Sequence, residues 1–98
     1  MKINKIIDQE KLTIALSGRL DTTTAPELEA TLKESLEGVT SLILELSDLE
    51  YISSAGLRVL LSAQKIMMKQ GKMVIRNAND TIIEVFEITG FIDILTIE

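Results

Sequence analysis

Two adjacent serines, Ser53 and Ser54, are the residues of this chain best suited to chemistry, and they lie in the stretch ISSAGL. The stretch separates a segment with the pattern of a strand from a segment with the pattern of a helix. A serine before a helix is commonly an N-cap, whose loss costs about 0.5–2 kcal/mol. A serine hydroxyl can also act as a nucleophile or accept a phosphoryl group. The spacing favours the cap and leaves modification as the alternative.

Serine nucleophile catalysis finds no support elsewhere in the sequence. The chain contains no histidine and no cysteine, so it lacks the commonest general base, the commonest metal ligand and the thiolate nucleophile. Neither a G-x-S-x-G elbow nor a G-x-x-x-x-G-K-S/T phosphate loop occurs. We therefore expect a protein that is not an enzyme, with no catalytic residues, no metal site and no cofactor.

The net charge and the apolar segments narrow the classes of partner. The formal net charge is −5 at pH 7, which argues against nucleic acid because phosphate binding needs a basic patch. No apolar run approaches the roughly 20 residues of a membrane span. The first ten residues, MKINKIIDQE, carry charges where a signal peptide needs an apolar segment. Together with the absence of cysteine, which suits a reducing compartment, these features predict a cytoplasmic protein without membrane insertion.

The hydrophobic pattern predicts five strands. The segments are 1–8 (MKINKIID), 11–18 (KLTIALSG), 40–47 (TSLILELS), 72–78 (KMVIRNA) and 93–98 (DILTIE). In the second segment Leu12, Ile14 and Leu16 alternate with small or polar residues, which gives the strand one buried face. The two-residue link QE between the first two segments suits an antiparallel hairpin.

Three helices are expected between these strands. Their predicted caps and ends are, in chain order, Thr24 and Gly38, Ser53 and Gly71, and Asn79 or Asp80 and Gly90. Thr24 and Glu27 have the spacing of a capping box, and Pro26 lies in the first turn, where its missing N–H does no harm. The second helix is the longest and runs from about 54 to 70.

The alternation of strands and helices implies a single α/β domain of residues 1–98. We expect a mixed, mostly parallel sheet of about five strands that begins with an antiparallel pair. Right-handed crossovers between neighbouring strands then place the three helices mainly on one face.

The long helix carries a narrow polar stripe when its residues are projected at about 100° per residue. The stripe consists of Arg58, Ser62, Lys65 and Lys69. Extending the projection back puts Ser54 beside the stripe and Ser53 on the apolar side, so Ser53 is the expected cap and Ser54 presents its hydroxyl to solvent. The remaining surface is apolar, so either it is wholly buried or one flank near Leu61 and Met68 receives a partner.

A phosphate would suit Ser54 at this position. The helix N-terminus offers unpaired N–H groups and the positive end of the dipole, which stabilise a negative charge by about 0.3–1 kcal/mol. The small residues Ala55 and Gly56 let another molecule approach the helix closely. The modification would leave the fold intact and add nearly two negative charges to a docking surface. A loss of about 3 kcal/mol in binding lowers affinity more than a hundredfold.

Over essentially all 98 residues the chain resembles the STAS domain of bacterial anti-sigma factor antagonists. Three segments carry the resemblance: GRLDTTTAPEL after the second strand, LILELSDLEYISSAGLRVLL from the third strand into the long helix, and FEITGF near the end. The middle segment is the most specific, because it joins a strand, an acidic and aromatic link, a serine motif, Gly-Leu and an aliphatic helix.

The resemblance implies a function. In that family an unphosphorylated antagonist binds an anti-sigma factor that is also a serine kinase of the GHKL type, and so frees the sigma factor. The kinase phosphorylates a serine two residues before the glycine of the motif, which breaks the complex, and a PP2C-type phosphatase restores it. The matching serine here is Ser54. The implied partner surface comprises Asp21, Thr22, Ser53, Ser54, Ala55, Gly56 and Arg58. Without the resemblance, Asp21 is equally well a turn or capping residue.

The chain departs from the family pattern at three places. Ser53 stands where aspartate is common and Ala55 where serine or threonine is common, so kinase recognition is affected and Ser53 becomes the second candidate acceptor. The chain stops after LTIE, where many relatives continue into a final helix, so we expect that helix to be absent or very short. The surface left uncovered would favour a homodimer.

The sequence alone is also compatible with other functions. STAS domains also act as scaffolds in stress-signalling assemblies, as tails of anion transporters and as small subunits of lipid-transport systems. The absence of membrane spans counts against a transporter tail. A nucleotide-sensing module is a further alternative, with Tyr51 as the one aromatic residue near the hinge that could stack on a base.

Overall fold

Four strands and three helices alternate along the chain in the computed structural model, which describes residues 1–98. In chain order they are β1 (Lys2–Asp8), β2 (Lys11–Leu20), α1 (Ala25–Ser35), β3 (Ser41–Ile52), α2 (Ser54–Gln70), β4 (Lys72–Arg76) and α3 (Asp80–Thr89), followed by a short 3-10 helix, η1 (Phe91–Asp93). The sheet has the order β1-β2-β3-β4, with β1 antiparallel to β2 and the other pairs parallel. The predicted α/β fold with an initial antiparallel pair is confirmed.

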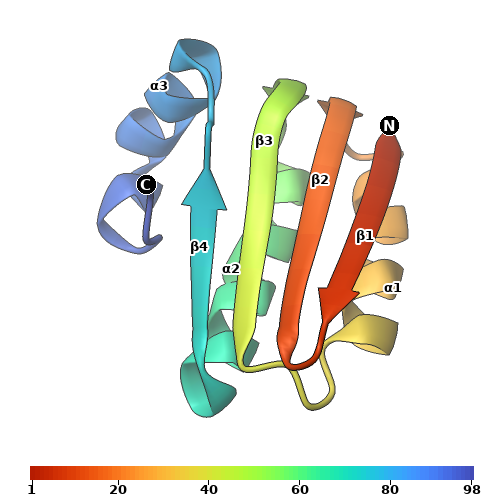
Figure 1. Ribbon diagram of the computed structural model, residues 1–98. Coiled ribbons are helices and arrows are strands. Elements are labelled where there is room, and N and C mark those ends of the chain that lie inside the picture. The colour runs from red at the N-terminus through yellow and green to blue at the C-terminus, as the bar shows by residue number, and fades with distance from the viewer.

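The helices α1 and α2 cover the back of the sheet, and α3 and η1 lie beyond its β4 edge (Figure 1). The alternating residues of β2 face this helical layer, and Leu12, Ile14 and Leu16 are at most 2% exposed. They belong to one core of 24 buried residues, which is aliphatic except for Phe86. Burial of apolar surface contributes about 25 cal/mol per Å², so the alternation in the strands is what holds the helices against the sheet.

The hairpin between β1 and β2 forms as predicted. Asp8 pairs with Lys11, which leaves Gln9 and Glu10 as a two-residue turn. Gln9 has φ +57°, the left-handed backbone conformation that tight hairpin turns require.

The predicted fifth strand is wrong. After Gly90, which ends α3 in the left-handed conformation, the chain turns into η1 instead of extending along β4. Only Ile97 forms a bridge to β4, opposite Ile75. Two hydrogen bonds support the bridge, from the Ile75 N–H to the Thr96 carbonyl at 2.8 Å and from the Glu98 N–H to the Ile75 carbonyl at 2.9 Å. The sheet therefore has four strands.

The strand β3 continues further than residue 47, the predicted end. Its register against β2 shifts between Ala15 and Ser17 and again between Gly18 and Arg19. Such bulges break the two-residue alternation and re-aim side chains. As a result Leu49 and Ile52 are both buried although they are three residues apart. The acidic and aromatic segment that the sequence suggested as a link before the serine motif is part of β3, which ends at Ile52.

The bounds of α2 and α3 agree with the predicted caps. Ser53 and Asn79 are the N-caps, and the two helices end before Gly71 and Gly90. A side chain at Gly71 would overlap the Thr40 carbonyl group, so glycine is required by the close approach of the two segments.

Candidate regulatory site

Ser53 is held at the start of α2 by three hydrogen bonds. Its N–H donates to the Leu20 carbonyl at 2.9 Å, and its carbonyl accepts the Leu57 N–H at 2.9 Å. Its Oγ accepts the Gly56 N–H at 3.5 Å, a long contact of the N-cap type. The side chain is half-buried. Ser53 therefore joins the end of β2 to the first turn of α2 and has little freedom to present its hydroxyl elsewhere.

Ser54 has the opposite environment. It is the first helical residue of α2, it is exposed, and its hydroxyl forms no hydrogen bond within the chain. The sequence projection therefore placed both serines correctly, with Ser53 as the cap and Ser54 at the surface. The Ser54 hydroxyl is free to meet another molecule at the N-terminus of α2.

Gly56 contributes to this site from the inside. It is buried, and a Cβ atom there would lie 2.7 Å from Leu20 Cγ and 2.9 Å from Ile52 Cγ1. The helix can thus pack directly against the ends of β2 and β3. The expectation that Gly56 makes room for an approaching molecule is wrong, because the space it leaves is filled by the protein's own core. Ala55 is half-buried and remains partly accessible.

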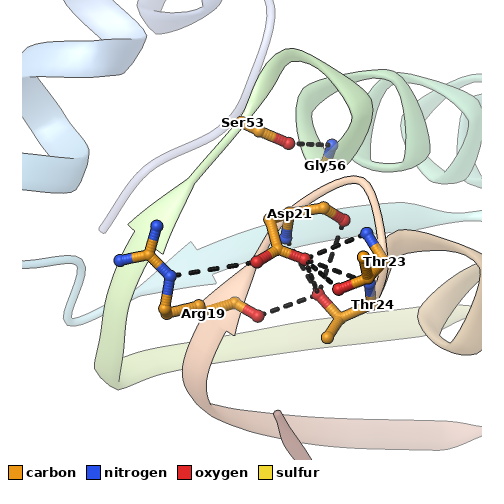
Figure 2. Close-up of polar contacts among 6 residues, drawn as sticks. All are labelled: Arg19, Asp21, Thr23, Thr24, Ser53 and Gly56. Carbon is orange, nitrogen blue, oxygen red and sulfur yellow. Dashed lines mark hydrogen bonds and ion pairs between the residues drawn. The ribbon is translucent and has the colours of Figure 1, made fainter.

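Asp21 organises the loop between β2 and α1 (Figure 2). Its Oδ1 accepts the Thr23 hydroxyl at 2.7 Å, the Thr23 N–H at 3.0 Å and the Thr24 N–H at 3.2 Å. The hydrogen bond from the Thr23 hydroxyl, together with the backbone N–H groups, holds the pKa of Asp21 below its ordinary value. Asp21 is therefore ionised at neutral pH. Its contacts within the loop are those of an aspartate that stabilises a turn, which was the alternative role considered for it in the sequence analysis.

Thr24 does not form the predicted capping box. Its side chain caps no helical N–H. Its hydroxyl instead donates to the Arg19 carbonyl at 2.8 Å and accepts the Asp21 N–H at 2.8 Å. The Asp21 carbonyl accepts the Ala25 N–H at 2.8 Å, so backbone contacts within the loop begin α1. Thr22 is exposed, and its hydroxyl forms no hydrogen bond within the chain.

Arg19 and Tyr51 extend the site, and the sequence analysis did not identify this pair. The two residues lie opposite each other on β2 and β3. The Arg19 guanidinium carbon is 4.2 Å from the centre of the Tyr51 ring, a cation–π distance, and its Nε is 3.8 Å from Asp21 Oδ2. Only the bulged register of β2 on β3 brings them together, and no spacing in the sequence indicates that register.

Arg58 lies one helical turn after Ser54 and is exposed. It lines a surface pocket of about 210 Å³ beside the N-termini of α1 and α2. The other lining residues are Thr22, Ala25, Pro26, Glu29, Ala55 and Val59. A second hollow of about 170 Å³ continues between α1 and α2 as far as Ile66. Of the predicted partner surface, Thr22, Ser54, Ala55 and Arg58 thus lie at or beside one accessible face.

The groups exposed at the site are suited to recognition by another molecule. No three His, Cys, Asp or Glu side chains gather closely enough to hold a metal ion. No helix combines the length and apolar character needed to cross a membrane. The exposed groups at the N-terminus of α2 are a free hydroxyl, an arginine and an ordered aspartate loop, which suit binding and modification by another protein.

The chain is similar to known proteins over almost all of its length. A family model described as STAS domain matches residues 2–98. BtrV of Bordetella bronchiseptica, assigned to the anti-sigma factor antagonists, is 40% identical over 88 residues, which cover 88% of this chain and 76% of that protein. The anti-sigma-B factor antagonist of Bacillus subtilis is 32% identical over 100 residues, which cover 99% of this chain and 92% of that protein.

Solved structures show the same fold. The anti-sigma factor antagonist SpoIIAA in its unphosphorylated form has a TM-score of 0.78 at 19% identity, covering 99% of this chain and 87% of that one. A second structure holds the Bacillus protein SpoIIAA in its phosphorylated form, with a TM-score of 0.77 at 20% identity and coverage of 99% and 91%.

Proposed function

The chain belongs to the STAS domain family, and we propose that it is an anti-sigma factor antagonist whose binding is switched by phosphorylation of Ser54. The names of its relatives support the first part of this proposal. The observation that carries the second part is the Ser54 side chain, which is exposed and free of hydrogen bonds at the N-terminus of α2. The protein then acts as a binding module, in the cytoplasm.

The proposed partner is an anti-sigma factor that is also a serine kinase of the GHKL type. The Ser54 Oγ bonds to the γ-phosphorus of ATP as the bond from that phosphorus to the β–γ bridging oxygen breaks, and ADP leaves. The hydroxyl proton passes to a base of the kinase, because the Ser54 hydroxyl has no hydrogen-bond partner in this chain. A PP2C-type phosphatase reverses the change by hydrolysis, which returns the hydroxyl and releases inorganic phosphate.

Ser54 is a better acceptor than Ser53 for a structural reason. The Ser53 Oγ faces the Gly56 N–H, and its side chain is half-buried. Modification there would cost the N-cap, worth about 0.5–2 kcal/mol. Ser54 is exposed and can be modified without breaking any side-chain hydrogen bond within the chain.

The phosphate would act on the complex through charge. A phosphoserine carries about −1.5 to −2 at pH 7, and it would join the ionised Asp21 loop on a protein whose net charge is already −5. A partner that accepts the neutral hydroxyl must then desolvate an anion. If binding loses about 3 kcal/mol, affinity falls more than a hundredfold.

Intact-mass measurement with peptide mapping tests the proposal, using protein purified from its own host beside a Ser54→Ala variant. We expect a species heavier by one phosphoryl group, mapped to Ser54 and missing in the variant. The unmodified protein should then capture the kinase from the host. Phosphate on Ser53 would contradict the assignment of the acceptor. A protein that is never phosphorylated under any growth condition would favour a constitutive STAS scaffold.

A further inference from the structure

Arg58 is a cation without an acidic partner in the chain. Four ion pairs form, and their cations are Lys5, Arg19, Lys33 and Arg76. The acid that shares a pocket with Arg58 is Glu29, and it is held by Lys33 at 3.2 Å on α1. Arg58 is therefore free to bind an anion that arrives nearby.

The position of Arg58 directs it toward Ser54. Residues four apart on a helix are neighbours on its surface, with Cβ atoms about 5–6 Å apart. Long side chains in a helix point back toward its N-terminus and lie over the residue three or four positions earlier. The favourable order on a helix is an anion four residues before a cation, and this is the order of a modified Ser54 and Arg58.

We propose that Arg58 captures the phosphoryl group once Ser54 is modified, an inference that rests on the proposed function. The guanidinium group offers a planar fork of N–H donors that matches phosphate oxygens with two parallel hydrogen bonds. The capture has two effects on the docking face. It holds the phosphate over the first turn of α2, and it withdraws from the partner the one arginine of this face that no other side chain engages.

Arg19 is the competing cation near the site. Its guanidinium stacks on Tyr51 at 4.2 Å and its Nε lies 3.8 Å from Asp21 Oδ2. A phosphate on Ser54 would have to draw Arg19 away from both contacts, whereas Arg58 gives up none. The capture by Arg58 is therefore favoured over capture by Arg19.

Phosphorus NMR of protein with phosphoserine encoded at position 54 during translation tests the capture. The second ionisation of a phosphoserine has a pKa near 6. An arginine four residues later should lower that pKa by about 0.15–0.4 pH unit relative to an Arg58→Gln variant. Arg19→Gln is the comparison for the competing cation. Lys65→Gln is the matched control, because it removes the same charge at a position about 16 Å along the helix from Ser54, which is beyond a Debye length of about 8 Å.

The result expected is a higher phosphate pKa in Arg58→Gln and no change in Lys65→Gln. Equal pKa values in the wild type and Arg58→Gln would overturn the capture, and so would a larger change in Arg19→Gln. Arg58 is exposed, so its variant should fold, and circular dichroism checks this. Because no kinase is needed, failure here leaves the proposed function standing. The absence of phosphorylation in the host would refute the proposed function and leave the capture to be judged by the NMR titration alone.

Discussion

At the residue scale, the two serines show how backbone position assigns roles to identical side chains. Ser53 has extended backbone angles, φ −99° and ψ 175°, which turn its hydroxyl toward the N–H groups of the first turn. Ser54 already has the helical conformation, so its hydroxyl projects outward. The resemblance to the family implies aspartate as a common residue in place of Ser53. Because aspartate and serine are equally good N-caps, this departure keeps the cap and leaves the position of Ser54 unchanged.

Gly56 is the residue on which the position of α2 depends most directly. We expect Gly56→Ala to destabilise the protein, because the new methyl group would lie 2.7 Å from Leu20 Cγ and 2.9 Å from Ile52 Cγ1. Overpacking costs about 1–3 kcal/mol, and the better helix propensity of alanine returns up to about 1 kcal/mol. A net loss of roughly 1 kcal/mol should appear in urea unfolding followed by circular dichroism.

Ser54→Ala is the control for this measurement. The Ser54 side chain is exposed and has no partner within the chain, so its variant should unfold within about 0.5 kcal/mol of the wild type. If Gly56→Ala is as stable as the wild type, α2 can shift away from Leu20 and Ile52, and the helix start is less tightly placed than the structure indicates.

At the scale of elements, the helices could be predicted better than the strands. Ser53 with Gly71 and Asn79 with Gly90 are start and stop signals that act through local backbone chemistry, so spacing alone located α2 and α3. The exposure of Ser54 followed from the same helical geometry. The far half of β3 did not follow, because its bulges depend on the register against β2.

The predictions of a capping box at Thr24 and of a strand at 93–98 also failed because contacts that the local pattern does not encode decide the structure there. Thr24 has the spacing of a capping box, but its hydroxyl finds partners in the Arg19 carbonyl and the Asp21 N–H, which the fold of the loop brings close. The segment 93–98 has the alternation of a strand, but its first residue, Asp93, belongs to η1. The rest of the segment forms only one bridge to β4, between Ile97 and Ile75. The pairing of Arg19 with Tyr51 likewise depends on contacts between strands that no local pattern encodes.

Asn79 joins two elements, which makes it the test of how α3 is held. Its Oδ1 accepts the Ile82 N–H at 3.0 Å as the N-cap of α3, and its Nδ2 donates to the Leu49 carbonyl of β3 at 2.9 Å. Asn79→Ala removes both bonds. We expect a loss of about 1–3 kcal/mol, from the cap and from the carbonyl left without its donor. Chemical denaturation measures the loss.

Thr81→Ala is the matched control on the same helix, because Thr81 is exposed and its side chain forms no hydrogen bond within the chain. It should change the unfolding free energy by no more than about 0.5 kcal/mol. Equal effects of the two variants would mean that the apolar contacts of Ile82 and Phe86, and not Asn79, hold α3 in place.

At the scale of the whole molecule, the architecture separates the core from the switch. The parallel strands β2 and β3 end at the same edge of the sheet, and the Asp21 loop and the start of α2 follow them there (Figure 1). Ligands of α/β sheets commonly bind outside the carboxyl ends of the strands. The aliphatic core lies between the sheet and the helices, so a change to the exposed Ser54 side chain at this edge can alter the surface without disturbing the packing of the core.

The modification of Ser54 should therefore change binding and spare the fold. Protein with phosphoserine encoded at position 54 should be as stable as the unmodified protein or more stable by about 0.3–1 kcal/mol, because the phosphate lies at the positive end of the α2 dipole. Phosphoserine at position 53 is the matched comparison, and it should destabilise the protein, since the half-buried Ser53 hydroxyl faces the Gly56 N–H. Thermal unfolding with amide hydrogen exchange distinguishes the two forms. If phosphate at position 54 lowered stability and exposed the amides of α2 to exchange, the switch would work by unfolding the helix, and the surface mechanism proposed here would be wrong.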